Sequence, residues 1–173
     1  MNRWKRPPPS HGDPWRAWLT SRGSLTWRIT ARSKDFRVQV LRQQLRIPNE
    51  DEYRRLGQPT HRRALVREVL LHAGGAPVVL AHSIAAWRDL SGTWRSLRGL
   101  GSRPLAHALF TDPLVHREAM EYTRLDPRHP LWRQAARLAG GPLPPLWARR
   151  SRFVKGGRPL LVTEVFLPRL LAL

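Results

Sequence analysis

One carboxylate stands alone in an apolar run near the end of the sequence. Residues 160–167 read LLVTEVFL, and Glu164 is the single charged residue among them. Such an acid must be paired, hydrogen-bonded or shifted in pKa, because an unpaired buried charge is very costly. Two interpretations follow: a structural salt bridge to Arg149, or an acid held inside a ligand pocket. The position alone leaves both open.

A cation occupies a similar place in an earlier apolar run. Residues 64–72 read ALVREVLLH, with Arg67 near the middle. If the following Gly74-Gly75 pair forms the loop of a hairpin, Arg67 faces His82. Arg67 could pair with a neighbouring carboxylate or extend its charged end to water. Alternatively, its guanidinium could hold a ligand carboxylate through a two-point contact.

Other catalytic chemistries find little support in the residue pattern. The chain has no cysteine, which removes thiol nucleophiles, and its seven histidines show no metal-ligand spacing. It contains no GxGxxG motif and no phosphate-binding loop. Ser24 lacks the surroundings of a nucleophile elbow, and we interpret it as a helix cap. A buried acid, a buried arginine, an apolar pocket and free backbone amides remain, which suits a small aromatic or cyclic carboxylate handled without a cofactor.

The composition is strongly basic. The 173 residues carry a formal net charge of +19, and only three of the 31 basic residues are lysines. This surplus attracts nucleic acid, acidic membranes or small carboxylates, so charge alone indicates only an anionic partner. The absence of cysteine fits a reducing compartment, and we expect a cytoplasmic location. Residues 69–87 lack Asp, Glu, Lys and Arg, but the central GGAP favours a hairpin over a membrane span.

Two Gly-Gly pairs predict the hairpins that position these residues. Glycine accepts the positive φ angles that a tight two-residue turn requires. The segments HAGGAPVVLA and VKGGRPLLVT share the turn and a proline at the same offset. We interpret them as two solutions to one turn problem rather than as an internal repeat. Around Gly156-Gly157 the expected facing pairs are Val154 with Pro159, Ser151 with Val162, and Arg149 with Glu164.

The remaining elements predict the α+β class with a six-stranded antiparallel sheet and helices packed on it. Residues 36–42 alternate like a half-buried strand, and residues 115–125 are compatible with either a strand or a helix. We assign residues 1–12 to a flexible, basic, proline-rich tail and residues 13–173 to a single domain. Helices are expected after Asp13-Pro14, after Ser24, over residues 94–100, after Pro104 and over residues 131–138.

Three blocks of the sequence resemble the chorismate lyase (chorismate pyruvate-lyase) family. They are REVLL with its Gly-turn-Pro hairpin, LGSRPLAHALF, and LWARRSRFVKGGRPLLVTEVFLP, in that order. The resemblance implies a six-stranded antiparallel sheet with helical flaps closing over a buried pocket. It also implies cofactor-independent cleavage of chorismate to 4-hydroxybenzoate and pyruvate, the first committed step towards ubiquinone. The substrate would be a small dianion, and we expect a monomer without a nucleic-acid partner.

The resemblance also implies roles for particular residues. Arg67 would pair with the ring carboxylate, and Glu164 would lie near the para oxygen, close to where the enolpyruvyl group leaves. Leu25 and Leu105 would supply backbone contacts. Our hypothesis is that Glu164 hydrogen-bonds or protonates the departing ether oxygen, a kind of help typically worth ~10²–10⁴ in rate.

Two positions depart from the family pattern. His82 and Ala86 stand where the family usually has Arg and Pro, so His82 is a possible contact for the second carboxylate.

The main alternative function is a basic nucleic-acid-binding module, which the charge and the eight tryptophans favour. The other alternative keeps the fold but gives it another chorismate-like ligand. Pyruvate release from chorismate distinguishes these functions.

Overall fold

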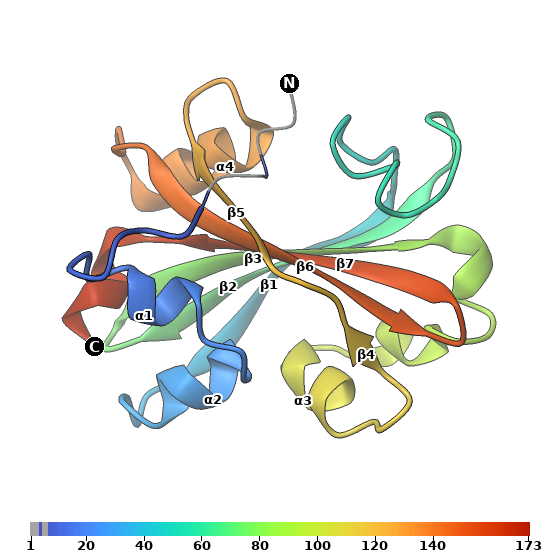
Figure 1. Ribbon diagram of the computed structural model, residues 1–173, viewed down its shortest axis with the longest axis horizontal. Helices are drawn as coiled ribbons and strands as arrows, with labels where there is room; N and C mark the ends of the chain where they lie inside the picture. The colour runs from blue at the N-terminus through green and yellow to red at the C-terminus, as the bar shows by residue number, and fades with distance from the viewer. Residues whose placement is uncertain (1–3, 5–6) are drawn as a thin grey trace.

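The fold is an α+β arrangement around one antiparallel sheet, as the sequence predicted. The computed structural model describes Trp4 and residues 7–173 (Figure 1). Within these residues, the sheet contains seven strands: β1 (Arg37–Arg46), β2 (Ala64–Ala73), β3 (Ala76–Ala86), β4 (His116–Arg117), β5 (Glu121–Leu125), β6 (Leu146–Lys155) and β7 (Arg158–Phe166). The helices are α1 (Arg16–Leu19), α2 (Leu25–Thr30), α3 (Leu105–Phe110) and α4 (Pro130–Ala139), with 3₁₀ helices η1 (Trp87–Asp89), η2 (Arg95–Gly99) and η3 (Pro168–Ala172).

The sheet is made of two meanders that join at its centre. The strand order is β1-β2-β3-β7-β6-β4, and β5 also pairs with β6. The central pair, β3 with β7, consists of the second strands of the two Gly-Gly hairpins. Both strands are largely buried on both faces, which agrees with the apolar composition of residues 160–167.

Both Gly-Gly turns have the predicted geometry. The φ angles are 59° and 73° at Gly74 and Gly75, and 53° and 72° at Gly156 and Gly157. Two successive positive φ angles define the primed turn that matches the twist of antiparallel strands. The predicted register around Gly156-Gly157 is confirmed, with Val154 opposite Pro159, Ser151 opposite Val162 and Arg149 opposite Glu164.

The predicted register of the first hairpin is wrong by one residue. Arg67 faces Ser83, and His82 faces Glu68. The cause is an irregularity between Leu71 and His72, which shifts the pairing beyond it by one position. Because side chains alternate between the two faces of a strand, this shift places His82 on the face opposite to Arg67.

Residues 115–125 form an interrupted strand rather than one continuous element. β4 and β5 pair with successive parts of β6, with His116 opposite Val154 and Leu125 opposite Leu146. Residues 118–120 separate them. The sequence predicted six strands, and the seventh arises because this single edge position is divided in two.

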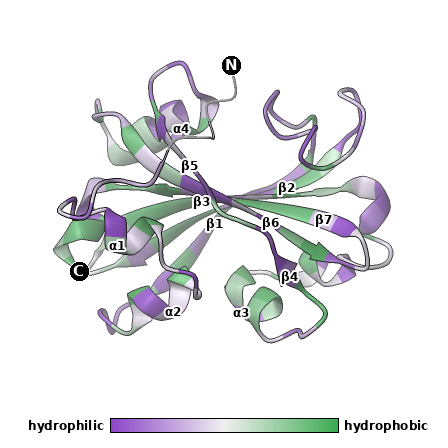
Figure 2. Ribbon diagram, in the orientation of Figure 1, coloured by the Kyte–Doolittle hydropathy of each residue, from purple (hydrophilic) through white to green (hydrophobic). Residues whose placement is uncertain are grey.

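Helices cover both faces of the sheet. In Figure 1, α1, α2 and α3 lie below the sheet and α4 lies above it. Trp18, Leu25 and Ile29 pack against Val69 and Phe166 on the first face. A second buried cluster on the other face includes Leu70, Leu80, Leu131, Ala135 and Val165. Figure 2 shows hydrophobic residues along the central strands and hydrophilic residues along much of the β1–β2 loop.

The N-terminal segment lies partly outside the described residues. The predicted tail, residues 1–12, includes residues 1–3 and 5–6, which the structure does not describe. Trp4 is 2% exposed and its ring lies 4.2 Å from the guanidinium carbon of Arg150.

Among the described residues, no helix has the length and apolar character needed to cross a membrane. Residues 69–87, which lack charged side chains, fall in the β2–β3 hairpin and η1.

Candidate active site

A cavity lies between the sheet and the helices α2 and α3. It brings together four of the five site residues named in the sequence analysis: Leu25, Arg67, Leu105 and Glu164. Its walls are mainly apolar. The other polar side chains that line it are Thr26, Ser83, Arg117, Arg149 and Ser151.

Arg67 presents a buried cation to this cavity. The residue is 4% exposed, and its two terminal nitrogens each donate a hydrogen bond of 3.3 Å, one to Gln43 Oε1 and one to the carbonyl of Arg103. Within the described part of the chain, no carboxylate lies within 4.0 Å of its guanidinium, and desolvation lowers its pKa. A buried guanidinium that lacks an acid of its own is suited to a ligand carboxylate.

Glu164 fulfils both interpretations that the sequence left open. It forms a salt bridge with the Nε of Arg149, and it also lines the cavity. Arg149 is 1% exposed, and its Nη1 donates to the carbonyls of Trp18, Leu19 and Ser21 at 3.1, 3.3 and 2.8 Å. The acid is therefore held in a fixed orientation by an arginine that is itself tied to the α1–α2 connection.

The backbone contacts expected from Leu25 and Leu105 fall at helix starts beside the cavity. The Ser24 hydroxyl accepts a 3.2 Å hydrogen bond from the amide of Trp27, which confirms the predicted cap and leaves Leu25 as the first residue of α2. Leu105 is the first residue of α3 and follows Pro104. Amide groups in the first turn of a helix lack intrahelical acceptors, so the backbone of both residues is suited to donate to a ligand.

Arg117 is a cavity residue that the sequence did not reveal. It lies on the two-residue strand β4 opposite Phe153, and the guanidinium is 5.3 Å from the centre of the Phe153 ring. Its strand is so short that residue alternation could not distinguish a strand from a helix at this place. The only available signal was the register with β6, which requires the tertiary pairing.

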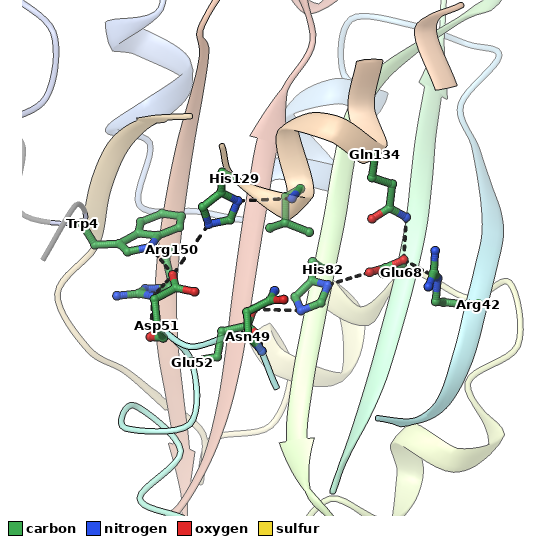
Figure 3. Close-up of polar contacts among 11 residues, drawn as sticks. Trp4, Arg42, Asn49, Asp51, Glu52, Glu68, His82, His129, Gln134 and Arg150 are labelled. Atoms are coloured by element: carbon green, nitrogen blue, oxygen red, sulfur yellow. Dashed lines mark hydrogen bonds and ion pairs between the residues drawn. The ribbon is translucent and has the colours of Figure 1, made fainter. Parts of the chain in front are cut away.

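The structure does not bring His82 to the cavity. His82 is buried on the other face of the sheet, where its Nδ1 is 3.0 Å from Glu68 Oε1 and its Nε2 is 2.9 Å from Glu52 Oε1 (Figure 3). Burial alone would lower the pKa of His82, but the two carboxylates outweigh it and raise the pKa to about 10. The predicted contact between His82 and a second ligand carboxylate is therefore replaced by an internal ion cluster. Ala86, the other departure from the family pattern, is fully buried at the end of β3.

The ion cluster anchors the β1–β2 loop to the back of the sheet. Glu68 on β2 also contacts Arg42 Nε at 2.6 Å and accepts a 2.5 Å hydrogen bond from Gln134 of α4. Glu52 belongs to the loop and is 2% exposed. The neighbouring Asp51 lies 3.0 Å from Nη1 of Arg150 on β6 (Figure 3).

Comparison with known protein families identifies sequence relatives along nearly the whole chain. The chorismate lyase family model matches residues 5–172. A relative from Ralstonia nicotianae is 48% identical over 92% of this chain and 84% of its own length. One from Aromatoleum aromaticum is 48% identical over 98% of this chain and 93% of its own length. Both relatives carry the name probable chorismate pyruvate-lyase.

Two solved structures share the fold and are distant in sequence. The C-terminal domain of PhnF superposes with a TM-score of 0.57 at 16% identity, over 75% of this chain and 80% of that domain. A transcriptional regulator of the GntR family from Bacillus cereus gives a TM-score of 0.56 at 11% identity, over 78% and 93% of the two chains. At these identities the likeness concerns the fold alone.

Proposed function

This chain belongs to the chorismate lyase family and is an enzyme of that family, and we propose that it cleaves chorismate to 4-hydroxybenzoate and pyruvate. The reaction would be the first committed step towards ubiquinone, and we propose that it takes place in the cytoplasm. The observation that carries this proposal is the meeting of Arg67 and Glu164 in one cavity, from separate hairpins. We also propose that the protein acts as a monomer.

The positions of the two residues suit the two ends of the chorismate ring. Arg67 on β2 pairs with the ring carboxylate, because no described acid competes for its guanidinium. Glu164 on β7 lies two strands away, which is about 10 Å at the spacing of neighbouring strands. That separation allows a six-membered ring to lie between them with its oxygen substituents at the Glu164 end.

The chemistry requires little beyond positioning and charge stabilisation. In chorismate the enolpyruvyl ether is attached to C3, and the retained hydroxyl is on the adjacent C4, para to the ring carboxylate. The C3–O bond breaks, the proton on C4 is lost, and the departing enolate takes up a proton to become pyruvate. Aromatisation of the ring drives the reaction without a cofactor. Glu164 accepts a hydrogen bond from the C4 hydroxyl or carries the proton to the ether oxygen, and Arg149 beside it stabilises the negative charge that develops there.

We propose that α2 and α3 act as the helical flaps of the site. Leu25 and Leu105 line the cavity from the starts of these helices. Trp27 and Phe110 contact each other with ring centres 6.0 Å apart. Separation of this pair would open a route from the cavity to solvent, and closure would exclude water during the reaction.

The test is a coupled assay for pyruvate release from chorismate, with 4-hydroxybenzoate quantified in the same samples. We expect the two products in equal amounts from the wild-type protein without added metal or cofactor. A folded protein that binds chorismate but releases neither product would contradict the proposal and favour a binding role for the same fold. Salt-dependent retention on DNA without turnover would favour the nucleic-acid alternative.

A further inference from the structure

The ionisable side chains that line the cavity carry more positive charge than one ligand carboxylate can balance. They are Arg67, Arg117, Arg149 and Glu164, three cations and one anion. Glu164 balances one of the cations, so the cavity retains two formal positive charges. Chorismate carries two carboxylates, whereas 4-hydroxybenzoate carries only one. The cavity therefore has a second unbalanced cation, which could pair with the substrate carboxylate that the ring product lacks.

Arg149 is not that cation. Its Nε is engaged by Glu164, and its Nη1 donates to three backbone carbonyls. The charge of Arg149 is therefore already balanced by Glu164, and a ligand carboxylate would have to compete with that acid for a side chain that is 1% exposed.

Arg117, unlike Arg149, has no acid that balances its charge among the described residues. Its Nε donates to the hydroxyl of Ser151 at 2.9 Å and its Nη1 to the carbonyl of Arg22 at 2.8 Å. Within the described part of the chain, its Nη2 makes no hydrogen bond and its guanidinium has no carboxylate within 4.0 Å. Desolvation lowers the pKa of Arg117, and the positive charge of Arg149 lowers it further. A nearby anion would relieve both effects.

The surroundings of Arg117 fix its direction. The guanidinium carbon lies 5.7 Å from the ring centre of Phe110 on α3 and 5.3 Å from that of Phe153 on β6. Contact with both rings, together with the hydrogen bond to Ser151, keeps the planar group in one orientation. Ser151 and Phe153 both line the cavity, so the arginine head is held along its wall.

The strand order places Arg117 at the far side of the cavity from Arg67. Arg67 lies on β2 and Arg117 on β4, with β3, β7 and β6 between them. Glu164 lies on β7, between the two arginines. A ring held by Arg67 at its carboxylate would thus have its opposite end near Glu164, with Arg117 beyond.

We propose that Arg117 binds the carboxylate of the enolpyruvyl group and so selects the dianionic substrate. The inference rests on the proposed lyase function and assigns the second anionic subsite of the same cavity. When the C3–O bond breaks, that carboxylate leaves with pyruvate, and the ring product keeps only its contact with Arg67. Arg117 thereby distinguishes substrate from ring product.

The test compares chorismate and 4-hydroxybenzoate on the variant Arg117→Gln. Glutamine keeps a donor for Ser151 or the Arg22 carbonyl but removes the charge. We expect the KM for chorismate to rise at least tenfold, while the Kd of 4-hydroxybenzoate changes less than twofold. Arg67→Ala is the matched control, because it should weaken both ligands. Arg117→Lys keeps the charge without the two-point geometry and should show a smaller rise in KM.

Three outcomes would overturn the assignment. A parallel loss of chorismate and 4-hydroxybenzoate affinity in Arg117→Gln would mean that Arg117 supports the cavity as a whole. An unchanged KM for chorismate in Arg117→Gln would mean that Arg117 contacts neither carboxylate. If Arg117→Lys bound both ligands as weakly as Arg117→Gln does, the result would again indicate a structural role. If the wild-type protein released no pyruvate, the proposed reaction would fail, but the Kd values of chorismate and 4-hydroxybenzoate, measured by calorimetry, would still test the second subsite.

Discussion

The buried ion cluster around His82 should make the stability of this protein depend on pH in a specific direction. His82 on β3 lies between Glu68 on β2 and Glu52 in the β1–β2 loop, and all three are at most 4% exposed. Arg42 on β1 and Gln134 on α4 complete the contacts of Glu68, and Thr163 is opposite His82 on β7. The charged form of His82 is thus favoured by the fold and has no such partners in the unfolded chain.

The magnitude follows from the difference in pKa between the two states. The pKa of His82 is raised from 6.5 to about 10 in the folded protein. A folded-state pKa above the unfolded one gives a stabilisation that is complete below pH 6.5 and is lost as the pH rises through 10. The contribution to the free energy of unfolding is about 5 kcal/mol at pH 6, roughly 3 kcal/mol at pH 8 and close to zero above pH 10.

The assay is urea unfolding of the wild-type protein and His82→Gln between pH 6 and pH 10. Other groups titrate in this range, but they contribute equally to both proteins, so the difference in unfolding free energy isolates His82. We expect that difference to be largest at pH 6 and to decline steadily with increasing pH. His61→Gln serves as the matched control, because His61 is exposed and should give a small difference without a trend.

A constant difference between wild type and His82→Gln across this range would refute the reasoning. It would show that His82 contributes through packing or as a neutral hydrogen-bonding partner. The opposite trend, with a larger difference at high pH, would mean that desolvation outweighs the two carboxylates. Against the effect of burial, the pKa values of Glu52 and Glu68 are lowered in the fold by the neighbouring His82, so both carboxylates stay charged across the measured range and do not alter the trend.

Three further predictions concern the cavity and the turn that supports it. Glu164→Gln should lower kcat by ~10²–10⁴. The Kd of 4-hydroxybenzoate should stay within a few fold, because Arg149 keeps its three carbonyl acceptors and holds the cavity wall in place. Unchanged turnover in the pyruvate assay would show that Glu164 takes no part in the chemistry. Arg67→Ala should weaken both chorismate and 4-hydroxybenzoate by roughly tenfold or more, measured by calorimetry, since a charge-assisted contact is lost; retained 4-hydroxybenzoate affinity would disprove the assignment of the ring carboxylate. Gly157→Ala should lower the unfolding free energy by about 1 kcal/mol without changing KM, because alanine is strained at a φ of 72°; thermal unfolding checks the first effect, and an undiminished Tm would contradict it.

The parts of the fold that local chemistry determines could be predicted from the sequence. The Gly-Gly pairs require a primed turn whatever surrounds them, so both turns and the pairing of Arg149 with Glu164 in the second hairpin were predicted correctly. Ser24 was predicted as a cap because a hydroxyl before an apolar helical run has few other roles. Arg67 on β2 and Glu164 on β7 were predicted as cavity residues because each is a charged residue in an apolar run.

The parts that depend on tertiary pairing could not be predicted. The irregularity between Leu71 and His72 has no local signature in the sequence. A predicted register that is wrong by one residue therefore placed His82 on the same face as Arg67, whereas it lies on the opposite face. The ion partner of His82 in the β1–β2 loop is Glu52, whose burial depends on the loop folding back over the sheet. Arg117 was missed for a related reason, since two residues of strand carry no readable alternation.

The join between the two meanders has a consequence for how the chain folds. Each hairpin closes a short loop and can form early, whereas β3 and β7 pair across the largest sequence separation in the sheet. Arg67 belongs to one meander and Glu164 to the other, so neither half holds a usable site by itself. Competence to bind ligand should therefore arise only with the late, slow docking of the halves, and ligand fluorescence followed during refolding would report that step rather than the formation of secondary structure.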